Sequence, residues 1–166
     1  QGVTALLVRR FRTGQGGFVE SSLLESMLDL QFELLSTRLN DESIHVERHG
    51  EHSAHAFLAA PYGTYPTADG YIALAMNPIP KLGQLLDVPA LEAMTDPQEA
   101  WDRQEEIEAV LAATFALQPT DHWLAILDAA DVWCAPVLTL DELLASEGFA
   151  AIEMTQEVTR RGKTIT

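Results

Sequence analysis

Residues 62–76 read YGTYPTADGYIALAM, and this stretch decides the fold. Two runs rich in apolar and aromatic side chains, residues 62–67 and 71–76, flank Ala68-Asp69-Gly70. An Asp-Gly pair between two such runs is typical of a tight turn joining antiparallel strands. The stretch therefore predicts a β-hairpin at the centre of a small antiparallel sheet.

Downstream of the hairpin the spacing of apolar residues becomes helical. Residues able to begin a helix recur, which predicts four helices that start at Asn77-Pro78, at Asp96-Pro97-Gln98-Glu99, near Thr120 and at Thr139-Leu140-Asp141-Glu142. Seven side chains on the second and third helices are expected in the core: Ile107, Val110, Leu111, Phe115, Trp123, Leu124 and Leu127.

Two further strand regions follow in the sequence. Residues 132–138 read as a strand, and Pro136 places it at the edge of a sheet because proline lacks an N–H donor. Residues 152–158 and 163–166 alternate in polarity on either side of Arg160-Arg161-Gly162, which predicts a second hairpin near the end of the chain.

Upstream of residue 62 the chain is helical and then irregular. Residues 1–12 predict a helix ended by the glycines of residues 13–17, with a short strand over 18–21. Ser22 and Glu25 have capping-box spacing, and the helix that follows is expected to run to Leu39 with apolar side chains around much of its surface. Residues 40–61 lose this periodicity and predict a long, mostly exposed connection.

The expected class is thus α+β: helices with a small antiparallel sheet, preceded by separate helices. We divide the chain into residues 1–40, a connecting loop over 41–61, and a small α+β domain over 62–166. Gln1 already lies within the first helical pattern, so we expect a fragment whose first helix begins upstream. The last hairpin is likewise expected to be truncated at the C-terminal end.

Composition narrows the classes of function. The 166 residues are 47% hydrophobic, enough for a sizeable core, and carry a formal charge of −15. Such a charge repels phosphate backbones and anionic lipids, so neither a nucleic acid nor a membrane is expected as a partner. No signal-peptide pattern opens the chain, and a single cysteine, Cys134, fits a reducing compartment. These features predict a cytoplasmic location.

A histidine cluster is the first candidate site. His45, His49, His52 and His55 recur at spacings of four, three and three, with Glu47 and Glu51 between them, which could line one helix face with metal ligands. However, Gly50 and Ser53 interrupt the segment, and it lacks both an apolar face and a cap. We therefore interpret it as a solvated loop and predict no metal site.

Other candidates are weaker. Residues 14–17 (GQGG) follow a helix, whereas a phosphate-binding loop leads from a strand into a helix. We therefore interpret them as a helix end. The nearby Arg9, Arg10 and Arg12 could still attract an anion. Cys134 is interpreted as a buried apolar residue. No serine has the setting of a nucleophile, and no carboxylate can be assigned a catalytic role from spacing alone.

Three blocks in order resemble class III CoA-transferases, the CaiB/BaiF family. Residues 10–25 (RFRTGQGGFVESSLLE) are similar to a family stretch of the pattern R-x-R-T-G-x-G-Q, with Gly17 in place of the usual glutamine. Residues 60–75 (APYGTYPTADGYIALA) and 134–142 (CAPVLTLDE) match later blocks in register. The resemblance covers nearly the whole chain and identifies it with the family's small domain and the helices leading into it from the large domain.

The resemblance implies an enzyme that moves coenzyme A between carboxylic acids through acyl-aspartyl intermediates, built as an interlaced homodimer. Its substrates would be an acyl-CoA thioester and a small carboxylic acid. The matching position for the nucleophilic aspartate lies upstream of Gln1, as does the domain that holds most of the CoA, so Asp29, Asp69 and Asp141 receive no catalytic role. CoA-contacting residues stay unassigned, no cofactor is assigned to this chain, and the isolated chain is expected to be inactive.

Two alternatives remain open. An α-methylacyl-CoA racemase of the same superfamily would use a histidine and an aspartate, and both would also precede Gln1. A non-catalytic assembly module is the alternative from a different class of function. The residues upstream of Gln1 would separate these cases.

Overall fold

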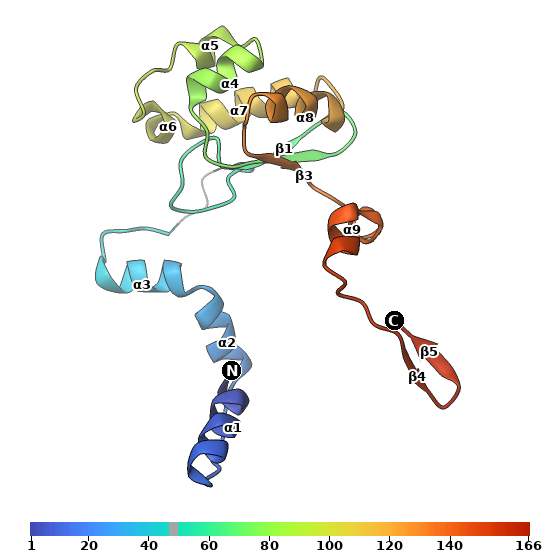
Figure 1. Cartoon of the computed structure of the whole chain (residues 1–166). Coiled ribbons are helices and arrows are strands. Elements are labelled where there is room, and N and C mark those ends of the chain that lie inside the picture. The colour runs from blue at the N-terminus through green and yellow to red at the C-terminus, as the bar shows by residue number, and fades with distance from the viewer. Residues whose placement is uncertain (47–49) are drawn as a thin grey trace. The chain divides into compact units, whose positions relative to one another are not determined.

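The computed structural model describes residues 1–46 and 50–166 (Figure 1). Contacts divide the chain into two compact units, Gln1–Glu47 and Arg48–Thr166. Both the helices and the small antiparallel sheets expected from the sequence are present, so the α+β class is confirmed. Among the described residues, no helix has the length and apolar character needed to cross a bilayer.

The first unit consists of three helices, α1 (Gly2–Thr13), α2 (Leu23–Leu30) and α3 (Phe32–Asn40). α1 ends as predicted, because Gly14 adopts a left-handed φ of 74° and its N–H donates to the Arg10 carbonyl at 2.8 Å. α2 begins with the predicted capping box: Glu25 N–H donates to Ser22 Oγ, and Ser22 N–H donates to the Glu25 carboxylate. None of the three helices contains a buried residue.

Two predictions for this unit were wrong. Residues 18–21 form no strand; here the chain turns back along α1, where Gly17 approaches Leu6 and Val19 approaches Gly2, and no neighbouring strand pairs with it in the described unit. The helix expected to run to Leu39 is broken at Gln31, whose φ and ψ are −103° and 20°. Neither half is held by buried side chains, so little packing energy opposes the break.

The second unit is built around a three-stranded antiparallel sheet of β1 (Gly63–Pro66), β2 (Tyr71–Leu74) and β3 (Cys134–Pro136), in the order β1-β2-β3. The predicted hairpin is confirmed, with Tyr65 opposite Ile72 and Thr64 opposite Ala73. β3 pairs only with β2, which places Pro136 in an edge strand as expected.

Seven helices occur between residues 77 and 151, where four were predicted: α4 (Ile79–Leu85), α5 (Pro89–Glu92), α6 (Glu99–Asp102), α7 (Gln104–Phe115), α8 (Thr120–Ala129), α9 (Leu140–Ala145) and α10 (Glu147–Ala151). Arg103, with φ −118°, separates α6 from α7. Ser146 separates α9 from α10, because its hydroxyl accepts from Phe149 N–H and starts a new helix.

The helix starts differ in how they are capped. Thr139 and Glu142 form a capping box at the start of α9, as their spacing predicts. Asn77 was expected to cap α4, but its side chain instead donates to the carbonyls of Ala75 and Trp133 and so joins the hairpin to the start of β3. α8 begins at Thr120 and is capped by Asp69 from the hairpin turn, as described below.

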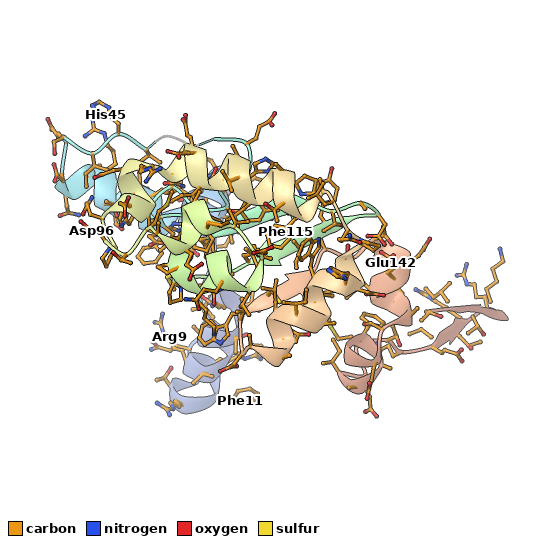
Figure 2. The ribbon with its side chains drawn as sticks, turned by 90° about the horizontal axis from the view of Figure 1, so that it is seen from above. Arg9, Phe11, His45, Asp96, Phe115 and Glu142 are labelled. Atoms are coloured by element: carbon orange, nitrogen blue, oxygen red, sulfur yellow. The ribbon has the colours of Figure 1, made fainter. Side chains whose placement is uncertain are left out.

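The core lies between the helices and one face of the sheet. α7 contacts β1 and α8 contacts β3, and Figures 1 and 2 show these helices on the same side of the sheet, with Phe115 among the packed side chains. Five of the seven predicted core residues are buried: Ile107, Leu111, Phe115, Trp123 and Leu127. Val110 and Leu124 are only half-buried and pack at the margin of the core.

The described parts of the connection, residues 41–46 and 50–61, are irregular as predicted, but the second of them is not mostly exposed. Ser53 and Pro61 are buried, and Ser53 forms a bridge with Gly63 at the start of β1. A buried side-chain amide also holds this segment against α7. Gln104 Nε2 donates to Ser53 Oγ at 3.4 Å and to the Glu108 carboxylate at 2.9 Å. Contacts distant in sequence therefore order a segment that lacks any periodic pattern.

The predicted second hairpin is present as β4 (Val158–Arg160) and β5 (Lys163–Ile165). The bounds of its first strand were predicted wrongly: residues 152–157 form no strand, and Arg160, expected between the two strands, is the last residue of β4. Arg161 and Gly162, with φ of 52° and 76°, form the turn.

Candidate functional site

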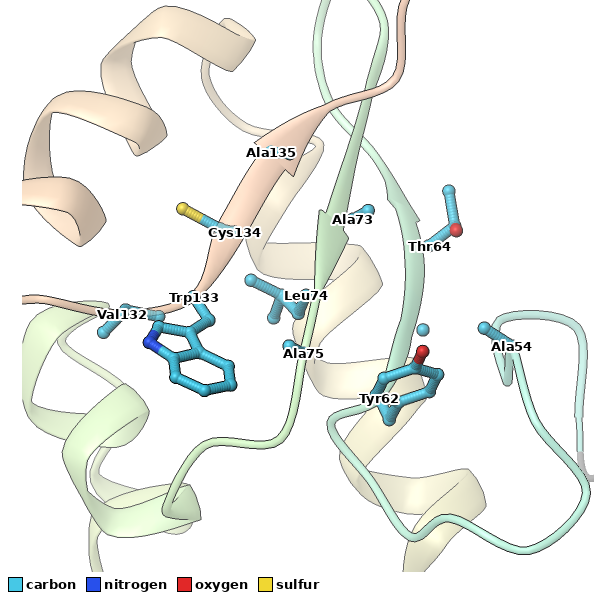
Figure 3. Close-up of a pocket in the computed structure, with 11 residues that line it drawn as sticks. Ala54, Tyr62, Thr64, Ala73, Leu74, Ala75, Val132, Trp133, Cys134 and Ala135 are labelled. Atoms are coloured by element: carbon cyan, nitrogen blue, oxygen red, sulfur yellow. The ribbon is translucent and has the colours of Figure 1, made fainter.

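The sheet face opposite the core carries an open trough of 540 Å³ (Figure 3). Its floor is made by three small side chains, Thr64, Ala73 and Ala135. They lie side by side because Ala73 pairs with both of the others, and directly opposed residues of an antiparallel sheet project to the same face. Each strand thus contributes one small residue, and together they leave a depression.

Two aromatic side chains rise beside this floor (Figure 3). Trp133 precedes β3 and is 68% exposed, while its carbonyl is fixed by hydrogen bonds from Ala75 N–H at 2.9 Å and Asn77 Nδ2 at 3.4 Å. Tyr62 precedes β1 and is half-buried, and its ring meets the edge of the His55 ring at 6.4 Å. Fixed backbones thus present two aromatic rings to a shared apolar surface.

Chemically, the trough is suited to binding and poorly suited to covalent catalysis. None of the residues that line it is a carboxylate, a histidine or a cation within the described chain. Cys134 lines the trough, but its side chain packs against the core, where partial burial and the carboxylate of Asp128, 3.5 Å from Sγ, raise the thiol pKa to about 11. The thiol is therefore protonated near neutral pH and is a weak nucleophile. Cys134 is half-buried, so its predicted burial is only partial.

The histidines predicted as a solvated loop have separate surroundings. His52 stacks on Tyr65 at 5.5 Å and donates from Nδ1 to the Thr64 carbonyl at 3.1 Å. His55 Nδ1 accepts from Phe57 N–H at 3.1 Å. His45 is exposed, and His49 lies outside the described residues, as does Glu47. Over residues 1–46 and 50–166, no three His, Cys, Asp or Glu side chains come together in a metal-binding group.

None of the three aspartates given no catalytic role is among the residues that line the trough. Asp69 Oδ1 accepts from Thr120 N–H at 2.8 Å and from Thr120 Oγ at 3.0 Å, and these hydrogen bonds lower the carboxyl pKa below its ordinary value. Its charge thus stabilises the start of α8. Asp29 in α2 and Asp141 in α9 are exposed on their helices.

The trough was missed by the sequence analysis. The only signal is a small residue at an alternating position of each strand, and its meaning depends on the register that aligns residues 64, 73 and 135. The glycines over 14–17 are found at a helix end, in agreement with the interpretation given above.

Comparisons with known proteins agree with one another. A family model described as CoA-transferase family III matches residues 1–166. An acyl-CoA transferase of Fusarium pseudograminearum is 29% identical over 165 residues, which cover 94% of this chain and 35% of that protein. A succinyl-CoA:glutarate CoA-transferase of Mus musculus is 25% identical over 150 residues, or 86% of this chain and 33% of the relative.

Solved structures show the same fold. The crystal structure of Rv3272 from Mycobacterium tuberculosis has a TM-score of 0.72 and 26% identity, covering 99% of this chain and 43% of that chain. A CaiB/BaiF family protein from Brucella suis has a TM-score of 0.73 at 24% identity, covering 98% and 43%. This chain spans about a third of the length of the curated relatives it matches. With a family model matching its whole length, the chain belongs to CoA-transferase family III.

Proposed function

We propose that this chain is part of an acyl-CoA:carboxylate CoA-transferase that works through aspartyl intermediates. The observation that carries the proposal is the family match over residues 1–166. The names of the two curated relatives, an acyl-CoA transferase and a succinyl-CoA:glutarate CoA-transferase, support the same reaction type. The substrates of the parent protein would be an acyl-CoA thioester and a small carboxylic acid.

The nucleophilic aspartate is proposed to lie outside this chain. Asp69 is engaged in capping α8, Asp29 and Asp141 are exposed on their helices and do not line the trough, and the Cys134 thiol is protonated. In the proposed enzyme the small domain contributes a binding surface, while covalent chemistry takes place on residues upstream of Gln1. The parent protein is proposed to be a cytoplasmic homodimer whose subunits interlace.

The test compares this chain with a version extended upstream through the preceding codons of its gene. The extended protein is expected to move CoA from an acyl-CoA to a free carboxylic acid, and substitution of its upstream aspartate by asparagine is expected to abolish transfer. The 166-residue chain alone is expected to show no transfer and no CoA-dependent heat in calorimetry. A covalent acyl adduct on the isolated chain would contradict this assignment.

The same assay separates the alternatives. Exchange of the proton next to the thioester carbonyl, without CoA transfer, would identify the extended protein as a racemase. Absence of both reactions in a folded, CoA-binding protein would instead identify an assembly module.

A further inference from the structure

The charges around the trough bear on which acyl group it can accept. Lys81 and Arg103 are the only Lys or Arg residues between positions 50 and 157 of the sequence. Lys81 Nζ donates to the Ala130 carbonyl at 2.6 Å, and Arg103 forms ion pairs with Glu99 and Glu106 at 2.8 Å and 2.6 Å. Neither is among the residues that line the trough, so no lining side chain supplies a counter-charge for an anion.

The shape and the apolar lining favour a hydrocarbon group. A volume of 540 Å³ lies within the range of small-molecule sites, which is roughly 300–1,000 Å³. The small floor residues let a ligand approach the sheet closely, and the indole of Trp133 offers a flat apolar surface for it to pack against. Contact with such a surface removes apolar area of both ligand and indole from water.

A free carboxylate at the far end of the acyl group, as in a dicarboxylic acid, would be disfavoured in the trough for two reasons. A carboxylate that loses water without gaining a cation or hydrogen-bond donors is destabilised. The many Asp and Glu residues between positions 50 and 157, set against only Lys81 and Arg103, which have partners of their own, also give a negative potential that opposes a dianionic ligand.

We propose that the trough holds the uncharged hydrocarbon part of the acyl group, so that the parent enzyme acts on monocarboxylic acyl groups in preference to dicarboxylic ones. This inference rests on the proposed CoA-transferase function and adds the substrate class to it. Trp133 and the floor residues Thr64, Ala73 and Ala135 are the specificity-determining contacts.

The test uses fluorine NMR of the chain labelled with 5-fluorotryptophan. The three tryptophans give three resonances, and Trp133→Phe assigns the one at the trough. Hexanoyl-pantetheine is expected to shift the Trp133 resonance and to leave those of Trp101 and buried Trp123 in place. Adipoyl-pantetheine, which has the same chain length and a terminal carboxylate, is expected to bind roughly tenfold more weakly, as one unpaired polar group costs.

Two variants of the floor, one of them with a matched control, test which residues are responsible. Ala73→Leu fills the floor and is expected to abolish the shift, whereas Ala113→Leu, on the exposed side of α7, is the matched control and is expected to preserve it. Thr64→Lys places a cation in the floor and is expected to reverse the preference in favour of the adipoyl probe. Far-ultraviolet circular dichroism checks that each variant is folded.

Several outcomes would overturn the inference: no shift with either probe, equal affinity for the two probes, or a shift that survives Ala73→Leu. A Trp133 resonance that moves with protein concentration alone would show that a second copy covers the trough, which also overturns it. An extended protein that transfers CoA between dicarboxylic acids would refute the substrate class and keep the transferase. An extended protein that transfers no CoA would refute the proposed function itself.

Discussion

Helices α1 and α7 are both twelve residues long, yet only one of them has a core to pack against. α1 contains no buried residue, and Phe11 is 87% exposed and projects away from the helix (Figure 2). α7 buries five residues, including Phe115, whose ring lies 5.4 Å from Trp123 and 5.7 Å from Tyr65. Apolar spacing is therefore enough to form a helix, whereas burial requires partners that come from distant parts of a chain.

The same contrast holds for whole units. Residues 1–46 expose long apolar side chains along all three helices, among them Leu23, Leu30 and Phe32. In the second unit, β1, β2, α4, α5, α7 and α8 bury large apolar side chains against one another, whereas α9, α10, β4 and β5 bury none. Exposed apolar surface of this extent marks an interaction site. We therefore expect the first unit to be covered by another protein segment.

The largest effect is expected for Phe115→Ala. Removing this fully buried ring leaves a cavity beside Tyr65 and Trp123, and is expected to lower the free energy of unfolding by about 3–5 kcal/mol. Phe11→Ala is the matched control and is expected to change it by less than about 0.5 kcal/mol when the protein is dilute. Urea unfolding followed by circular dichroism measures both. Equal losses would show that α1 has a core of its own in solution.

Association is expected to depend on the exposed helices. At about 25 cal/mol per Å², covering roughly 600 Å² of this surface contributes on the order of 15 kcal/mol before association costs, enough for a dimer despite the charge of −15. Leu28→Glu is expected to raise the dimer dissociation constant by at least about tenfold, because it places a charge in an apolar contact.

Light scattering at tens of micromolar measures this association. Ser26→Glu adds the same charge to an exposed position of α2 and is the control, for which little change is expected. A monomeric wild-type chain, or a dimer unaffected by Leu28→Glu, would show that the helices of the first unit are not the interface.

A smaller effect is expected for Asp69→Ala, which removes the cap of α8. The folded-state pKa of Asp69 is lowered, so its stabilisation is present above the ordinary aspartate pKa of about 3.9 and is lost as pH falls through the lowered value. The variant is expected to have a lower urea midpoint than the wild type at pH 7, and the difference is expected to shrink toward pH 3. Asp121→Ala, in the first turn of the same helix, keeps the hydrogen bonds to Thr120 and is the control. A difference independent of pH would exclude the charged cap.

No effect is expected from metal removal. A metal held only by the native state contributes directly to stability, so a strong chelator would lower the melting temperature if the histidine segment were a structural metal site. His52 and His55 instead make ring and backbone contacts with neighbouring residues. We expect differential scanning calorimetry to give the same melting temperature with and without EDTA. A clear decrease would restore the metal hypothesis.

Predictions from the sequence succeeded where the determining contacts are short in sequence. The Asp-Gly turn, the Ser22–Glu25 and Thr139–Glu142 capping boxes and the glycine end of α1 each depend on residues within about one turn of one another. They failed where local preference had no tertiary support, as at residues 18–21, or where a distant partner competed, as at Asn77, which bonds to the Trp133 carbonyl 56 residues away.

The sequence by itself determined the glycine end of α1, the capping boxes of α2 and α9, the central hairpin, the edge position of β3 and the resemblance to the CoA-transferase family, because these follow from backbone preferences and motifs read along the chain. Only the tertiary structure decided the capping of α8 by Asp69, the burial of Ser53 and the alignment of Thr64, Ala73 and Ala135 into a trough. These features join residues that are distant along the chain. Their contacts form only when packing and strand register bring the segments together, and no local pattern encodes which segments will meet.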